Sequence, residues 1–220
     1  MAFHLPKSDT RTTVIGSTGS GKTQKACWLL AHCDWHRRPC YVLDFKGDSL
    51  IGDIGMTDIN VNMPPPRKPG LYRVPLIPGV TDEALTQFLW RVWRNENAIV
   101  YTDEGLMIGN RDPAFRALLT QGRSKNIQMI TLTQRPVFCD KFVFSEANYM
   151  FVMRLQTEDD RKVVSGYLDG TPIDRLPRFH SYWYSAEEQE GAHLAPVPGR
   201  AAILEIFDQR RASSKKVYAI

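Results

Sequence analysis

Residues 12–23 read Thr-Thr-Val-Ile-Gly-Ser-Thr-Gly-Ser-Gly-Lys-Thr, and this stretch decides the fold. Its β-branched run at 12–15 predicts a buried strand, and residues 22–33 predict a helix. Between them, residues 16–23 match Gly-x-x-x-x-Gly-Lys-[Ser/Thr], the pattern of a phosphate-binding loop. The pattern lies between a predicted strand and a predicted helix, which favours this interpretation over an ordinary glycine-rich turn.

The chemistry of such a loop assigns a task to each part of it. Glycines let the backbone curl so that successive N–H groups point at phosphate oxygens, and the following helix directs its positive dipole end at the same anion. Lys22 is expected to reach the β- and γ-phosphates of ATP, and the Thr23 hydroxyl is expected to bind Mg²⁺. The predicted nucleotide-binding residues are Gly16, Ser17, Thr18, Gly19, Ser20, Gly21, Lys22 and Thr23.

Asp103 and Glu104 directly follow the apolar run at 98–102, which predicts a buried strand. Taken alone, two acidic residues after a strand are more typical of a turn exposed to solvent. Downstream of a phosphate-binding loop, the pair is typical of a catalytic site in which Asp103 holds Mg²⁺ through water and Glu104 polarises the attacking water. The adjacent glutamate favours hydrolysis of ATP over phosphoryl transfer to a small-molecule acceptor.

Strands and helices are predicted to alternate along the chain, which indicates an α/β fold with a largely parallel central sheet and helices on both faces. Residues 46–80 are rich in loop signals, and the linker-like stretches lie at 60–80 and 191–200. The further predicted strands are 40–45, 127–133, 149–153, 180–185 and 201–207, and the further predicted helices are 82–95, 112–121 and 157–168.

The charges are distributed unevenly along the chain. Lys and Arg number 28 and Asp and Glu number 24, and residues 210–220 hold four of the bases and no acid. Residues 1–209 are therefore balanced in charge, which excludes a uniformly basic nucleic-acid coat but not a local basic site. We predict a single P-loop ATPase domain over 1–209 and an accessory basic tail over 210–220.

Several other classes of protein are disfavoured. No run approaches the ~18 apolar residues of a membrane-spanning helix, and the N-terminus lacks the apolar core of a signal peptide. The four cysteines form no Cys-x-x-Cys pair. A zinc site built on Cys33 and His36 matches no paired-ligand spacing, so buried thiols in a reducing cytoplasm are expected.

The chain resembles the FtsK–HerA family of DNA-pumping ATPases. The residues that carry the resemblance, besides the phosphate-binding loop and the acidic pair, are Tyr-Val-Leu-Asp-Phe-Lys-Gly at 41–47, the segment 119–136 ending in Thr-Gln-Arg-Pro, and the segment 148–161. The similarity covers residues 12–170. Phe45 stands where the family usually has proline.

The resemblance implies roles for three further residues. Gln134, at the tip of the strand beside the strand of the phosphate-binding loop, would sense the γ-phosphate; alternatively it is a polar turn residue before Pro136. Arg123 would be the arginine finger that reaches the nucleotide of a neighbouring subunit, or else a solvated arginine at a helix end. Arg135 would either bind phosphate or brace Asp103, and both alternatives stay open.

The resemblance also implies a RecA-like fold, ATP and Mg²⁺ as cofactors, and a homo-oligomeric ring, hexameric or pentameric, that moves double-stranded DNA. The small size is similar to that of tectivirus-type genome-packaging ATPases, which implies a capsid vertex or portal protein as partner and a location in the host cytoplasm or at the virion vertex. DNA would be held through its phosphates. Candidate contacts, each also readable as a surface charge, are Lys46, Arg67, Lys68, Arg111 and Lys141.

Three other functions remain as alternatives. A phage assembly, export or conjugation-coupling ATPase of the same superfamily normally carries a membrane segment, which is not found here. A P-loop phosphotransferase acting on a small molecule is disfavoured by the pair Asp103 and Glu104 and by Gln134. A non-hydrolysing nucleotide-binding scaffold is disfavoured because every chemical part for hydrolysis is in place.

Overall fold

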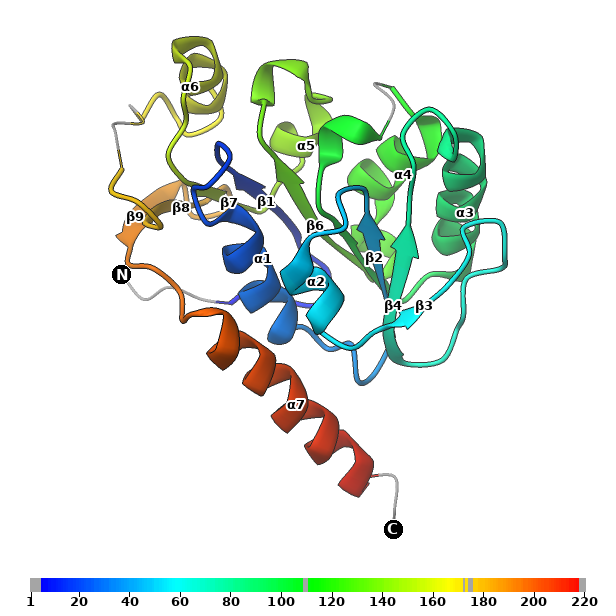
Figure 1. The fold of residues 1–220 in the computed structure, drawn as a ribbon. Helices are drawn as coiled ribbons and strands as arrows, with labels where there is room; N and C mark the ends of the chain where they lie inside the picture. Colours follow the sequence, from blue (N-terminus) through cyan, green and yellow to red (C-terminus); the bar gives the residue numbers. More distant parts are fainter. Residues whose placement is uncertain (1–4, 109–110, 172, 174–175, 218–220) are drawn as a thin grey trace.

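The computed structural model describes residues 5–108, 111–171, 173 and 176–217 (Figure 1). One sheet runs through this part of the chain, with the strand order β3-β4-β2-β5-β6-β1-β7-β8-β9. The strands are β1 Arg11–Ile15, β2 Pro39–Asp44, β3 Thr57–Asp58, β4 Gly70–Pro75, β5 Ala98–Thr102, β6 Ile127–Thr133, β7 Tyr149–Val152, β8 Ser181–Ser185 and β9 Glu190–Leu194.

Every strand pair from β3 to β7 is parallel, whereas β8 and β9 add an antiparallel edge. The helices are α1 Lys22–Ala31, α2 Ser49–Asp53, α3 Asp82–Asn95, α4 Pro113–Gln121, α5 Phe142–Ser145, α6 Glu158–Ser165 and α7 Arg200–Val217, with 3₁₀ turns η1 Gly105–Met107, η2 Arg123–Lys125 and η3 Pro136–Phe138. The predicted α/β fold with a largely parallel sheet is confirmed.

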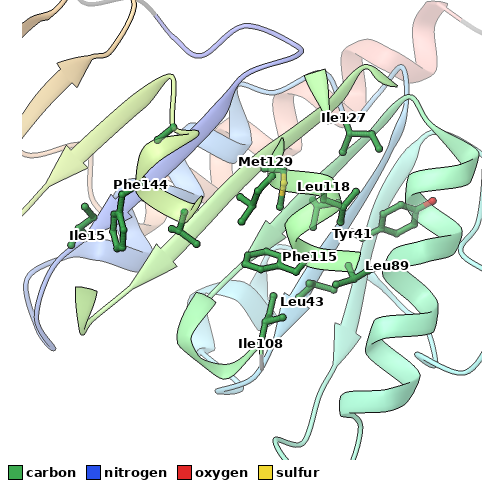
Figure 2. Packing of buried hydrophobic residues seen from close by; sticks show 14 of the residues in the cluster. Ile15, Tyr41, Leu43, Leu89, Ile108, Phe115, Leu118, Ile127, Met129 and Phe144 are labelled. Atoms are coloured by element: carbon green, nitrogen blue, oxygen red, sulfur yellow. The ribbon is translucent and has the colours of Figure 1, made fainter. Parts of the chain in front are cut away.

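Two buried clusters lie on opposite faces of the sheet. Neighbouring strand residues alternate between them, as the pleat requires: Val14 packs with α1, α2 and α7, whereas Ile15 packs on the side of α3, α4 and α5. Figure 2 shows part of the cluster that contains Ile15, where Phe115 of α4 lies beside Leu43 of β2. Helices therefore cover both faces, as expected.

The prediction of a strand over residues 201–207 is wrong, because these residues belong to α7. Ile203 and Phe207 are both fully buried, and their spacing of four places them on one face of a helix. This apolar face packs into the cluster that includes residues of α1. Figure 1 shows α7 running along the side of the sheet that carries α1 and α2. The buried residues of this short apolar run therefore recur with the period of a helix and not with that of a strand.

The predicted boundary between residues 209 and 210 falls inside α7. The Arg210 guanidinium donates to the carbonyl of Ala31 at the end of α1 (2.7 Å), and Arg211 donates to the carbonyl of Gly55 (3.0 Å). The start of the predicted basic tail therefore contacts the body of the domain.

The stretch 60–80, interpreted from sequence as a linker, contributes β4 to the sheet. This strand pairs in parallel with β2, from Pro39 opposite Gly70 to Asp44 opposite Pro75. Leu71 and Val74 are buried, so the strand belongs to the core despite its flanking loop signals. Within the described residues, no helix is long and apolar enough to cross a membrane.

Replacing Phe207 by alanine is expected to lower the free energy of unfolding by about 3–5 kcal/mol, because it leaves a cavity beneath α7. The ring is fully buried and lies 6.1 Å from that of Trp35, centroid to centroid. Urea denaturation measures the change. The exposed Gln209 on the same helix provides the control, and Gln209→Ala is expected to cost less than about 0.5 kcal/mol. Equal effects of the two changes would show that α7 does not pack as described.

Candidate active site

The phosphate-binding loop is fastened to the two strands that flank β1. The Gly16 amide donates to the carbonyl of Thr133 at the end of β6 (3.1 Å), and the Ser17 amide donates to the carbonyl of Arg154 just after β7 (3.0 Å). A side chain at position 16 would place its Cβ 2.6 Å from Ser20 Oγ. Gly21 has the left-handed φ of 95° just before α1, which favours glycine. The predicted loop and its context are thus present.

The first turn of α1 is arranged to receive an anion. It contains no acidic residue, and no side chain caps it. Lys22 at its start is buried. This burial, and to a smaller degree the positive charge of Lys46, lowers the pKa of the Lys22 ammonium to about 8. A bound phosphate would replace the water that this ammonium has lost, so the loop favours a polyphosphate ligand.

Asp103 lies buried just beyond the end of β5. Its Oδ1 accepts a hydrogen bond from the Phe45 amide (3.0 Å), whereas its buried Oδ2 has no hydrogen-bond partner. Burial raises the pKa of this carboxyl to about 6. An acceptor without a partner at the carboxyl edge of the sheet, near the P-loop helix that carries Thr23, fits a hydrated Mg²⁺ ion. The described part of the chain contains no group of three or more His, Cys, Asp or Glu that could hold a metal ion. Mg²⁺ usually keeps several waters and binds through one or two carboxylates together with phosphates of the substrate.

Glu104 connects to the phosphate-binding loop through Gln134. Its Oε1 accepts a hydrogen bond from the Gln134 amide (3.2 Å), and the Gln134 side-chain oxygen accepts one from the Thr18 hydroxyl (2.9 Å). Strands β5, β6 and β1 are neighbours in parallel register, so their carboxyl ends place these residues at one edge of the sheet. The structure therefore brings together the predicted loop, acidic pair and Gln134.

Lys46, predicted from sequence as a DNA contact, lies in this same site. Its Nζ is 2.7 Å from Oε2 of Glu104. The sequence signal for this placement is its position two residues beyond β2, a strand that pairs with β5. Because carboxyl ends of parallel strands share an edge, a lysine after β2 reaches acids that follow β5.

The two arginines assigned by resemblance lie in different places. Arg123 begins η2, before β6 and hence at the opposite edge of the sheet from the phosphate-binding loop, and its side chain is 67% exposed with Asp9 at 3.6 Å. Arg135 pairs with the buried Asp160 at 3.1 Å. That contact corresponds to neither alternative left open from sequence, phosphate or Asp103.

The other basic candidates are divided between the two edges of the sheet. Arg67 and Lys68 precede β4, and Arg67 donates to Asn95 Oδ1 at the end of α3 (2.6 Å), which places them at the amino edge. Arg111 and Lys141 are exposed in segments that follow β5 and β6, at the carboxyl edge. The structure does not bring these residues into one basic patch.

A hollow of about 430 Å³ opens beside the phosphate-binding loop on the side of β7. Sequence reasoning did not identify it, because its walls come from three separate segments. It is lined by Ser17, Thr18, Arg154, Leu155, Gln156 and Arg161. Arg154 and Arg161 give its lining a positive charge.

No family model matched the chain. Solved structures that share its fold include the genome packaging NTPase B204 of Sulfolobus turreted icosahedral virus 2 with AMPPCP (TM-score 0.68, 16% identity, 87% of this chain and 100% of that one) and VirB4 of Thermoanaerobacter pseudethanolicus (TM-score 0.63, 10% identity, 86% and 89%). At such identities the likeness shows the fold alone.

A sequence relative is more informative. The chain is 42% identical over 219 residues to the DNA packaging ATPase P9 of Enterobacteria phage PRD1, and the match covers 94% of this chain and 96% of the relative. This finding confirms the resemblance to small viral packaging ATPases. The chain is a P-loop ATPase and belongs to the family of the phage DNA packaging ATPase P9.

Proposed function

We propose that several copies of the chain form a ring, and that this ring hydrolyses ATP to drive double-stranded DNA into a viral capsid. The observation that carries the proposal is the continuous connection from Thr18 through Gln134 to Glu104, beside the unpartnered oxygen of Asp103. It joins the phosphate-binding loop to a buried acid that can accept a proton from water. The 42% identical DNA packaging relative supports DNA as the cargo.

The residues act in a defined order in this proposal. The backbone amides of the loop and the Lys22 ammonium bind the phosphates of ATP. Thr23 and Asp103 hold Mg²⁺, which when bound neutralises charge on the phosphate oxygens. Glu104 orients a water and takes its proton as the water attacks the γ-phosphate, the β–γ phosphoanhydride bond breaks and ADP leaves. Gln134 reports the presence of that phosphate, because its side chain contacts the loop while its amide contacts Glu104.

Arg123 completes the site of a neighbouring subunit rather than its own. It lies at the sheet edge opposite its own phosphate-binding loop and is exposed. An arginine that neutralises transition-state charge from a neighbouring subunit requires an assembly in which that edge of one subunit faces the nucleotide of the next. This supports a homo-oligomeric ring, which we expect to be hexameric or pentameric.

DNA would be held by phosphate contacts that do not depend on sequence. The exposed Arg111 and Lys141 lie at the edge that carries the ATPase site, so they are the candidates best placed to couple hydrolysis to DNA. Arg67 and Lys68 lie at the amino edge of the sheet, so they would contact DNA at a different height along the axis of the ring. A capsid vertex or portal protein would be the docking partner, in the host cytoplasm or at the virion vertex.

Glu104→Gln is expected to lower the ATPase rate by about 10²-fold or more while ATP binding persists, because the amide cannot accept the proton from water. Steady-state phosphate release and equilibrium binding of ATP measure the two effects. The exposed Glu158 provides the control, and Glu158→Gln is expected to leave the rate unchanged. A Glu104→Gln variant that keeps the wild-type rate would contradict the role of Glu104.

Mixing Arg123→Ala subunits with Glu104→Gln subunits is expected to restore part of the turnover. An intact Glu104 in one subunit then meets an intact Arg123 from its neighbour. The measurement is the ATPase rate of the assembled protein across mixing ratios. Lack of recovery at every ratio would exclude action of Arg123 on a neighbouring subunit.

The Mg²⁺ requirement is expected to depend on pH through Asp103. Its pKa is raised to about 6, so below that pH a proton competes with the cation for the carboxylate. The Mg²⁺ concentration for half-maximal ATPase activity is expected to rise by about tenfold per pH unit below pH 6 and to change little above it. Titrations of Mg²⁺ between pH 5 and 8 measure this, and a requirement independent of pH over that range would argue against Asp103 as the metal-holding group.

A further inference from the structure

The turn that follows β2 contacts both catalytic acids. The Phe45 amide donates to Asp103 Oδ1 at 3.0 Å, and the Lys46 ammonium pairs with Glu104 Oε2 at 2.7 Å. The Glu104 side chain is 3% exposed, whereas that of Lys46 is 33% exposed. The acid is therefore enclosed, and the lysine reaches it from the protein surface.

The backbone of this turn is fixed independently of Glu104. Asp44 Oδ1 accepts hydrogen bonds from the Lys46 amide (3.2 Å) and the Gly47 amide (2.7 Å), and Asp44 Oδ2 pairs with Arg73 at 2.7 Å. The Lys46 side chain, a flexible four-carbon stem, can therefore swing away without any movement of the turn.

The ion pair is incompatible with the proposed task of Glu104. Its Oε1 accepts from the Gln134 amide, and its Oε2 is taken by the ammonium of Lys46. A general base needs an oxygen within hydrogen-bond reach of the water whose proton it takes. An ammonium bound at that oxygen competes with the water, and its charge opposes uptake of a proton.

An anion at the surface would withdraw the lysine. Lys46 lies at the carboxyl edge of the sheet, as do the exposed Arg111 and Lys141. Its charge also contributes to the lowered pKa of Lys22, so two ammonium groups oppose each other in one site. A phosphodiester that binds Lys46 from outside relieves this repulsion and gains a charge-assisted hydrogen bond.

We propose that Lys46 holds Glu104 inactive in the resting protein and that a backbone phosphate of DNA binds the Lys46 ammonium and releases the carboxylate. Lys46 is thus a positioning residue that makes hydrolysis depend on DNA. The inference rests on the proposed function, since it requires DNA at the carboxyl edge of the sheet.

The test is the steady-state ATPase rate of Lys46→Met with and without duplex DNA. The DNA-free rate is expected to rise at least about threefold over wild type, and DNA is expected to add less than about twofold more. Lys46→Arg, which retains a cation, is expected to remain dependent on DNA.

Lys162 provides a matched control, because it forms a lysine–glutamate pair of similar length with Glu158 (2.8 Å) that is 70% exposed on both sides. Exposed pairs contribute little, so Lys162→Met is expected to keep the wild-type rates with and without DNA. Thermal melting and ATP binding establish that the Lys46 variants fold and load nucleotide, and Lys46→Gln serves as a second neutral variant.

Salt dependence of DNA binding gives a readout that a merely structural role would not change. A lysine that contacts a DNA phosphate releases a counterion, so Lys46→Met is expected to reduce the slope of log K against log[salt] by about 0.9. Lys162→Met is expected to leave that slope unchanged.

The possible failures are distinguishable. If DNA stimulates wild type but the neutral Lys46 variants keep the wild-type DNA-free rate and the same stimulation, the inference is overturned and the proposed motor function stands. Neutral variants that fold and bind ATP yet are inactive with and without DNA would place Lys46 in the chemical step, which also overturns it. If DNA does not stimulate wild type, the proposed function fails and the inference fails with it.

Discussion

The burial of two adjacent carboxylates at the end of β5 is the constraint on which the rest of the site depends. Asp103 and Glu104 are 3% and 2% exposed, and charges removed from water need partners of opposite sign or hydrogen-bond donors. The Phe45 and Gln134 amides and the Lys46 ammonium satisfy three of the four oxygens. The fourth, Asp103 Oδ2, has no hydrogen-bond partner, and in the proposed mechanism it binds the Mg²⁺ ion that accompanies the nucleotide.

Parallel strand order turns this local constraint into a site. Because β2, β5, β6 and β1 are consecutive neighbours, their carboxyl ends place Lys46, the acidic pair, Gln134 and the phosphate-binding loop side by side. Arg123 lies at the other edge, before β6. In the proposed mechanism, ATP is bound and attacked at one edge of this sheet, and Arg123 at the other edge serves a neighbouring subunit.

The structural features that were predicted correctly from sequence are those that depend on local order along the chain. Each of these features is encoded within a dozen residues. They are the loop at 16–23, the two acids after a buried run, and the strand that ends before Gln134. The sequence could not show that Lys46 pairs with Glu104 or that Arg135 pairs with Asp160, because those partners lie 58 and 25 residues apart. The helical state of 201–207 also depends on a distant partner, the surface of α1.

The most direct test of this account is the structure of the assembled protein with a slowly hydrolysed ATP analogue, Mg²⁺ and duplex DNA, determined by electron cryo-microscopy. We expect the terminal phosphate to lie beside Lys22 and Gln134. Glu104 should face this phosphate with its ion pair to Lys46 broken, and Arg123 of the adjacent subunit should contact the same phosphate. A closed ring in which Arg123 faces solvent and Glu104 remains paired with Lys46 beside bound DNA would contradict it.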